Sequence, residues 1–505
     1  MEKGKITSYT EQDADSKGFI TYHSFNEAEL KAYLEFINES LKEDPDVKSS
    51  LPINNDEGLI EISKDGIMIC KLINVAVPDT VDERTINRKK PLNVYQMTEN
   101  LRLGINAAIA IGCHIVNMNP QSFLSGKLHL IMGMVWQIMR IHLFKKINLK
   151  TTPEIISLAL PGETMETVLK LSSEKILLRW LNYHLKAAKQ SIVVKEIDEK
   201  LKDMVVFLHV LGQLDSTFNK SSLESSDLKK RAADVLQGAH KQGVKSAINE
   251  DAMIQGNAKI YIMFCSLLFN ANHGLYIEEV KKKEVEKAAL IDEAKSGTKE
   301  ERTFLLWINS LNIDGIYLNE LYEEIKDGLV ILKIINNIWP GTLVNGKYEK
   351  NPGTNKFKMI ANGEYVSKLC KDKGLVTVSM RSSMLIESNP SLVLGLIWQL
   401  MRANYLQIVG GKTEEELVAW ANKTVNKPPG IKNFKDPQLK TSLFLIDLMS
   451  NLQPGIVDQS LVTEGRTDEE IVLNAKYCLS IARKMGAKIF LTWEDIKLVI
   501  LHLII

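Results

Sequence analysis

The chain has 505 residues, of which 45% are hydrophobic and 25% are charged, and its formal net charge is +1. This length predicts several domains, and the composition is typical of a folded protein rather than a disordered one. A net charge this close to zero provides no global field that would favour nucleic acid or a membrane surface as the partner.

The cysteines and the apolar segments predict a cytoplasmic protein. The five cysteines form no CxxC pair and mostly lie in apolar segments, which indicates buried thiols in a reducing compartment. The first twenty residues are too polar for a signal peptide. The longest apolar stretch, residues 128–144, contains His129, Arg140 and His142, so it predicts a buried helix rather than a membrane span.

An aromatic residue followed two positions later by Asn recurs four times along the chain, each time in an apolar helical segment. The four pairs are Phe36/Asn38, Trp180/Asn182, Trp307/Asn309 and Trp420/Asn422. Self-similarity at a spacing near a hundred residues predicts tandem small domains. We expect the three tryptophans to anchor the cores of their domains, since large aromatic side chains dominate core burial.

Each of these helices is followed by three more predicted helices. The second helices are expected at 65–74, 202–211, 326–335 and 441–450, and the third at 100–112, 228–243, 363–374 and 474–486. The fourth are expected at 128–144, 258–269, 391–406 and 497–505. The third helix of each repeat ends in Gly, which favours a left-handed C-terminal cap. Asp65 and Asp327 are candidate N-terminal caps of second helices. With no convincing alternating strand, the fold class is all-α, with four helical repeats.

The four repeats form two similar pairs. LHLIMGMVWQIMR at 128–140 in repeat one and PSLVLGLIWQLMR at 390–402 in repeat three are close copies, and repeats two and four lack this ending. The order is therefore A-B-A-B, a duplicated pair. Two copies of one binding module in a single chain would make a crosslinker.

These features resemble the calponin-homology fold, and nearly the whole chain resembles the actin-bundling core of the fimbrin (plastin) family. The residues that carry the resemblance are 75–117, which contain DERTIN, the WQIMR and WQLMR helices, 300–311 and 474–487. The resemblance implies two actin-binding domains, each a pair of calponin-homology domains. The expected boundaries are an N-terminal tail 1–20, domain one 21–149, domain two 170–275, a linker 276–299, domain three 300–410 and domain four 412–505.

The resemblance also implies where the filament contacts lie. They would fall on 30–41, 128–144 and 174–187 in the first pair and on 302–311, 391–406 and 414–425 in the second. The candidate actin-binding residues are Arg84, Arg88, Lys89, Lys90, Lys127, His129, Trp136, Arg140, Lys175, Arg179, Lys356, Lys358, Arg402 and Lys423.

Two candidate surfaces can also be explained without a binding partner. The basic stretch RTINRKK at 84–90 would suit an acidic filament, and it would equally suit a solvated loop. In 128–144, Met132, Met134 and Met139 could form an adaptable binding surface if exposed, although part of this helix must be core.

Other kinds of site are not favoured. DADSKG at 13–18 departs from a calcium loop, with Lys17 at a ligand position, so we expect bundling that is insensitive to calcium. GGKT at 410–413 lacks the first Gly of a phosphate loop, and no HExxH or GxSxG occurs.

The sequence therefore predicts a monomeric, non-enzymatic actin-bundling protein with no cofactor, no metal, and no nucleic-acid or membrane partner. The first alternative is an adaptor that binds one filament through one pair and another partner through the second. The second alternative, an enzyme, would require a site built from residues scattered along the sequence.

Overall fold

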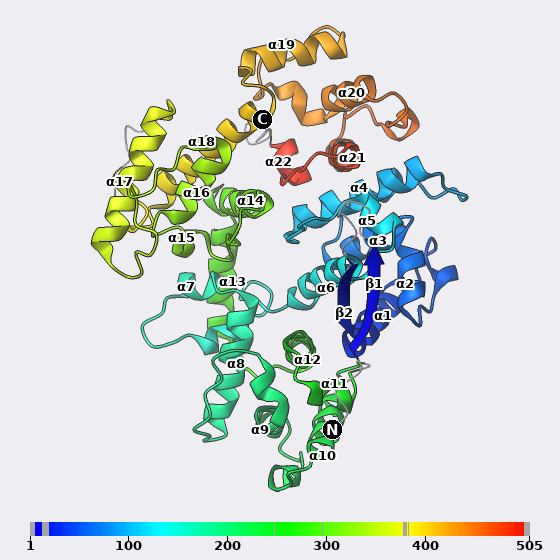
Figure 1. Ribbon diagram of the computed structural model, residues 1–505, viewed down its shortest axis with the longest axis vertical. Helices are drawn as coiled ribbons and strands as arrows, with labels where there is room; N and C mark the ends of the chain where they lie inside the picture. The colour runs from blue at the N-terminus through cyan, green and yellow to red at the C-terminus, as the bar shows by residue number, and fades with distance from the viewer. Residues whose placement is uncertain are drawn as a thin grey trace. The chain divides into compact units, whose positions relative to one another are not determined.

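The computed structural model describes residues 6–12, 20–246, 248–294, 296–376, 381 and 383–498. The chain divides into two compact units (Figure 1). Unit 1 comprises Met1–Pro78, Asn87–Leu101 and Met118–Ile291, and unit 2 comprises Asp79–Ile86, Arg102–Asn117 and Asp292–Ile505. Unit 1 thus contains repeat two and most of repeat one. Unit 2 contains repeats three and four together with two segments of repeat one.

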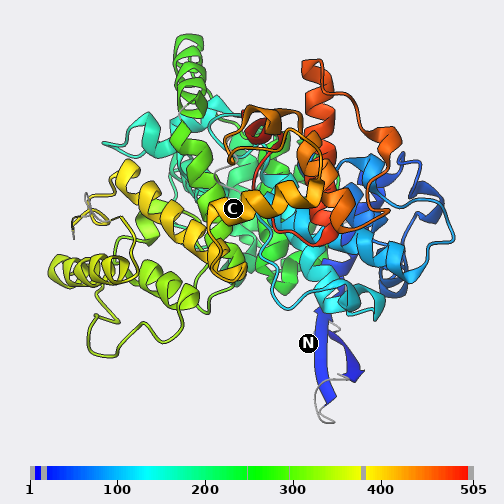
Figure 2. The ribbon, with the colours of Figure 1, turned by 90° about the horizontal axis from the view of Figure 1, so that it is seen from above.

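A short antiparallel hairpin precedes the helices of unit 1. β1 (Ile6–Gln12) pairs with β2 (Ile20–Asn26) in a register that places Ile6 opposite Asn26. Figure 2 shows the hairpin projecting beyond the neighbouring helices of repeat one. The sequence did not predict it, because its strands, ITSYTEQ and ITYHSFN, are mostly polar and show no clean apolar alternation. The DADSKG segment at 13–18 lies outside the described residues.

The other described secondary-structure elements of unit 1 are helices. Repeat one contains α1 (Glu27–Leu41), η1 (Lys48–Ser50), α2 (Asp56–Ser63), α3 (Ile67–Ala76), η2 (Glu83–Thr85), α4 (Val94–Ile111), α5 (Pro120–Leu124) and α6 (Leu128–Phe144), of which η2 and the second half of α4 belong to unit 2. η3 (Pro153–Leu158) and α7 (Met165–Leu169) lead to repeat two. Repeat two contains α8 (Ser173–Ala187), η4 (Glu199–Asp203), α9 (Val205–Leu214), η5 (Ser221–Glu224), α10 (Leu228–Lys241), α11 (Glu250–Gln255) and α12 (Ala258–Ala271).

A charged helix connects the second and third repeats. It is α13 (Glu279–Ala294), and it is followed by α14 (Ser296–Ser310). Repeat three continues with α15 (Leu321–Glu324), α16 (Leu329–Ile338), α17 (Lys356–Asp372) and α18 (Pro390–Ile408). Repeat four contains α19 (Glu414–Val425), η6 (Pro437–Thr441), α20 (Leu443–Leu452), η7 (Gln459–Leu461), α21 (Asp468–Met485) and α22 (Trp493–Lys497).

The Asn of each aromatic-x-Asn pair holds a downstream loop against its own helix. In repeat three, Asn309 Nδ2 donates to the Leu318 carbonyl at 2.8 Å, and the Leu318 N–H donates to Asn309 Oδ1 at 2.8 Å. The other repeats have the same two-way bond; the pairs are Asn38 with Ile53, Asn182 with Val194, and Asn422 with Ile431. We call this bond the loop clamp. It satisfies both backbone polar groups of one loop residue.

A second buried polar residue joins the third helix to the loops around it. In repeat one, Asn100 Oδ1 accepts from the Asn87 N–H at 2.8 Å, and its Nδ2 donates to the Asp65 carbonyl at 3.0 Å. Asn362 and Asn474 make the corresponding bonds in repeats three and four. Repeat two instead uses Arg231, which donates to the carbonyls of Asp203, Ser222 and Leu223. The three Asn side chains are fully buried.

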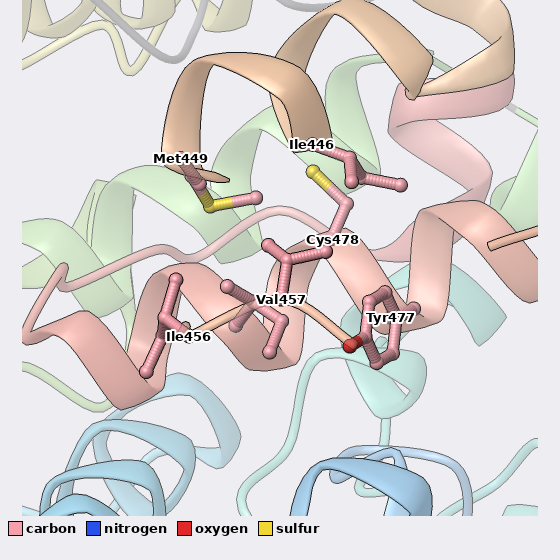
Figure 3. Packing of buried hydrophobic residues seen from close by; sticks show 7 residues of the cluster. Ile446, Met449, Ile456, Val457, Tyr477 and Cys478 are labelled. Carbon is pink, nitrogen blue, oxygen red and sulfur yellow. The ribbon is translucent and has the colours of Figure 1, made fainter. Parts of the chain in front are cut away.

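The predicted core tryptophans behave differently from one another. Trp180 and Trp307 are 0% and 1% exposed, as predicted, but Trp420 is 42% exposed. In α19 the buried positions are Val418, Ala421 and Val425, whose helical spacing places residue 420 on another face. The prediction of a core role for Trp420 is therefore wrong. Figure 3 shows the core of repeat four, which is built instead by α20, α21 and the loop between them, and includes Ile446, Val457 and Cys478.

Several local predictions are confirmed. Gly112, Gly243, Gly374 and Gly486 all have positive φ, between 74° and 114°, at the ends of the third helices. The Asp65 and Asp327 carboxylates accept from the backbone N–H groups of Ile67 and Leu329, each at 2.9 Å. The five cysteines are buried thiols, and none of them forms a disulfide. The all-α class is confirmed for the four repeats.

Replacing Asn309 with Ala should destabilise unit 2. The substitution leaves the N–H and the carbonyl of Leu318 without their partner, so we expect the free energy of unfolding to fall by about 2–3 kcal/mol. Calorimetric unfolding of the full chain measures this change, and Asn351→Ala, at an exposed position in the same repeat, is the control. Equal unfolding temperatures for the two variants would contradict a role for the clamp.

Candidate functional site

The basic stretch 84–90 divides between the two units. In unit 1, Arg88 and Lys90 lie 3.5 Å and 3.3 Å from the carboxylates of Asp46 and Asp65, and Lys89 is exposed. Side-chain exposures of 37% for Arg88 and 58% for Lys90 leave both cations at the surface. These three residues therefore form a positively charged patch that a partner could reach.

Arg84, the first residue of this stretch, is bound inside unit 2. Its guanidinium pairs with Asp82 at 2.6 Å, donates to the carbonyls of Leu461 and Leu473, and lies over the Tyr477 ring at 5.4 Å. A filament contact through Arg84 would have to compete with these bonds. Arg84 and Lys89 therefore differ as candidate contacts, because Arg84 is bonded within unit 2 and Lys89 is exposed.

More polar bonds join the 79–86 segment to α21. Arg483 Nη1 donates to the Thr80 carbonyl at 2.8 Å, and Lys484 Nζ donates to the Thr85 carbonyl at 2.9 Å. The Asp82 N–H donates to Ser480 Oγ at 2.8 Å. Arg483 and Lys484 are only 4% and 5% exposed, and burial, together with repulsion from Arg302, lowers the pKa of Arg483 to about 10. The buried cations rely on these carbonyl acceptors, because an unpaired buried charge is costly.

The last helix of repeat one contributes four candidate residues. Lys127 and His129 are half-buried at the start of α6. The Trp136 ring stacks on Tyr33 with the ring centroids 6.1 Å apart. Arg140 is bonded to Glu174 of α8 at 2.9 Å and lies over the Phe144 ring at 5.2 Å. The Met residues 132, 134 and 139 are 5%, 0% and 1% exposed, so they belong to the core and form no exposed Met surface.

The first helix of repeat two contributes two candidate residues, Lys175 and Arg179. Lys175 is exposed on the first turn of α8, next in sequence to Glu174. Arg179, one turn further along α8, instead forms a bidentate ion pair with the Glu163 carboxylate, with N–O distances of 2.6 and 2.7 Å. This bond, together with the backbone N–H of Leu160, lowers the pKa of Glu163 to about 2. Arg140 therefore pairs with the first turn of α8 and Lys175 is exposed on the same turn, whereas Arg179 is bonded to the loop that contains Glu163.

Repeats three and four reproduce this junction. Arg402 Nε donates to Glu414 Oε1 at 2.8 Å, just as Arg140 pairs with Glu174. The guanidinium of Arg402 lies 5.9 Å from the centre of the Trp398 ring. In each pair, the Arg of the WQ-x-M-R motif thus binds a Glu in the first turn of the next repeat. The sequence predicted both Arg residues and missed both Glu partners, although the repeated motif followed by an acidic helix start was a usable signal.

The other candidates in unit 2 are exposed lysines. Lys356 and Lys358 lie in the first turn of α17, and Lys358 is 3.3 Å from Glu349. Lys423 lies in α19, close in sequence to the half-exposed Trp420. These residues leave a positively charged edge on repeat three and a smaller one on repeat four.

The described part of the chain offers little for other kinds of site. Within it, no three His, Cys, Asp or Glu side chains gather in a way that would hold a metal ion. None of the helices there combines the length and apolar character needed to cross a bilayer. His114, next to Cys113, stacks on Tyr317 with the ring centroids 4.8 Å apart.

Comparisons with known proteins give one consistent result. The calponin homology (CH) domain matches residues 27–144, 171–274, 298–405 and 411–503. Fimbrin-4 of Arabidopsis thaliana is 37% identical over 94% of this chain and 75% of its own length, and Plastin-3 of Danio rerio is 38% identical over 94% and 78%. The crystal structure of the actin-crosslinking core of Schizosaccharomyces pombe fimbrin is similar with a TM-score of 0.82 at 34% identity, covering 95% of this chain and 98% of that one.

Replacing Arg84 with Ala should lower the stability of unit 2, because the guanidinium joins Asp82 to two carbonyls near α21. We expect a loss of about 1–2 kcal/mol. Lys89→Ala, at an exposed position, should leave the unfolding temperature unchanged. The two variants are compared by calorimetry, and similar behaviour would contradict the structural role given to Arg84.

The Glu163–Arg179 pair should make stability depend on pH in acid. The pKa of Glu163 is lowered from 4.5 to about 2, so the pair's contribution is fully present above about pH 5. It is lost as the pH falls towards 2, because the unfolded chain then binds the proton more readily. Glu163→Gln should therefore be less stable than the parent at pH 7, and the gap should close between pH 5 and 2. Chemical unfolding at several pH values measures the gap, and a constant gap would contradict the assignment.

Proposed function

Because the chain belongs to the fimbrin (plastin) family of calponin homology proteins, we propose that it binds actin filaments and crosslinks them into bundles. The related Schizosaccharomyces pombe structure is described as an actin-crosslinking core, and it corresponds to nearly all of this chain. Crosslinking requires two filament sites in one molecule and no bond-making step. The proposal therefore assigns no catalytic role to any residue.

The observation that supports it most directly is the duplicated junction. Arg140 with Glu174 and Arg402 with Glu414 join the last helix of an odd repeat to the first helix of the following even repeat. A partner that binds one junction would meet closely related chemistry at the other. Two such junctions would allow one molecule to hold two filaments without dimerising.

Within this proposal, the candidate residues of each pair are filament contacts. In the first pair they are Arg88, Lys89, Lys90, Lys127, His129, Trp136, Arg140 and Lys175; in the second they are Lys356, Lys358, Arg402 and Lys423. Arg84 and Arg179 remain candidates whose intramolecular bonds a filament would have to displace. We assign the pairs the boundaries 21–149 with 170–275 and 300–410 with 412–505, which the four CH matches support. We place the protein in the cytoplasm, on the actin cytoskeleton, as a monomer without nucleic-acid or membrane partners.

Co-sedimentation with actin filaments at two speeds tests the function. The full chain should pellet with filaments at high speed, and at low speed it should also pellet the filaments themselves as bundles. Both amounts should fall as salt is raised from about 50 to 200 mM, because exposed lysines attract an acidic surface less when screened. Binding without low-speed pelleting would favour the adaptor alternative, in which the second pair has another partner. No binding at either speed would reject the proposal.

A further inference from the structure

Two aromatic side chains project into solvent at the same place in repeats one and three. Tyr95 and Phe357 are 84% and 85% exposed, the highest values among the exposed large hydrophobic residues of the described chain. Tyr95 lies five residues before the buried Asn100 in α4, and Phe357 lies five residues before the buried Asn362 in α17. A single exposed aromatic needs no explanation, but the same one in both copies of a duplicated module does.

Both aromatics lie at the start of a hydrogen-bonded helix. In repeat one, Asn93 Oδ1 accepts from the Gln96 N–H at 2.9 Å; in repeat three, Asn355 Oδ1 accepts from the Phe357 N–H at 3.0 Å. Further along each helix, Asn100 and Asn362 fasten it to the preceding loop. Both rings therefore lie on hydrogen-bonded helical backbone, so a partner that buries them needs to order little of the main chain.

Several cations lie close to each aromatic in the sequence, and we call them its rim. Arg88, Lys89 and Lys90 precede Tyr95, and Lys350, Lys356 and Lys358 surround Phe357 in sequence. Three of the six have an acidic neighbour within 3.5 Å: Arg88 with Asp46, Lys90 with Asp65, and Lys358 with Glu349. The side chains of Lys90 and Lys358 are nevertheless 58% and 45% exposed. An aromatic ring within a positively charged rim suits an acidic protein surface that contains an apolar depression.

The even repeats lack this arrangement. Five residues before Arg231, the repeat-two counterpart of Asn100, the chain has Ser226, and five residues before Asn474 it has Glu469. Glu469 belongs to an acidic first turn with Asp468 and Glu470. The feature therefore belongs to the leading repeat of each pair and is not a general property of the fold.

We infer that Tyr95 and Phe357, each with its rim of cations, form an additional filament contact in each pair, outside the first and last helices of the leading repeats. The inference rests on the proposed actin-binding function and extends it to the start of the third helix. Each ring anchors into an apolar depression of the filament, and the surrounding lysines and arginine face acidic residues around it. Aromatic anchors of this kind carry a large share of the binding energy at protein interfaces.

Serine substitutions test the inference in the full chain. Tyr95→Ser and Phe357→Ser are made singly and together, and Tyr276→Ser, at a side chain that is 80% exposed outside both rims, is the matched control. Tyr95→Phe combined with Phe357→Tyr keeps both rings. Because the replaced side chains contact solvent, all variants should unfold at the temperature of the parent.

We expect the double serine variant to bind filaments about tenfold more weakly in high-speed co-sedimentation. Each single variant should still bind through its intact pair but pellet fewer filaments at low speed. The control and the ring-preserving variant should match the parent within about twofold. If the parent binds and the double serine variant binds and bundles equally well, the inference is overturned while the proposed function stands. If the parent itself does not bind, the proposed function fails and the contact fails with it.

Discussion

The loop clamp is the interaction on which each repeat depends. A helix of a small bundle can bury its apolar side, but the irregular segment that follows carries backbone polar groups that no helix satisfies. Asn38, Asn182, Asn309 and Asn422 solve this problem in one way, by offering an amide that matches both groups of one loop residue. The second set, Asn100, Asn362 and Asn474, does the same for the third helix. With the loops fixed in this way, the pair junctions and the exposed rings have defined positions.

Polar groups also separate the roles of residues that are neighbours in sequence. Arg84 and Lys89 belong to one basic stretch, yet Arg84 holds main-chain carbonyls near α21 while Lys89 is exposed. Arg140 and Arg179 lie on either side of the boundary between repeats one and two, yet Arg140 pairs with the first turn of α8 while Arg179 is bonded to Glu163. Charge alone therefore does not identify a binding residue, because the available acceptors decide which cations remain accessible.

Much of the fold could be predicted from the sequence. Helical periodicity, terminal glycines and the recurring Asn located the four repeats and most of their helices, since these signals are local. The structural role of the Asn was not predictable, because its partner lies 9 to 15 residues away in an irregular loop. Trp420 was misjudged because motif identity does not reveal which face of a helix is buried, and only the positions of Val418, Ala421 and Val425 do. The ion-pair partners Glu174 and Glu414 were missed because pairing depends on how two repeats meet.

The hydrogen bonds between α21 and the 79–86 segment determine which fragments of the protein keep their native contacts. Arg483 and Lys484 are buried against carbonyls that the chain supplies some four hundred residues earlier. A fragment that starts at the charged connector would keep both cations but lose the carbonyls of Thr80 and Thr85. The Ile489 and Leu491 carbonyls would still accept from Arg483, so the cost is the loss of part of the set of acceptors around two buried cations. The point at which the sequence divides most simply is thus a poor place to truncate it. A dissected second half would report on a damaged repeat rather than on the intact molecule.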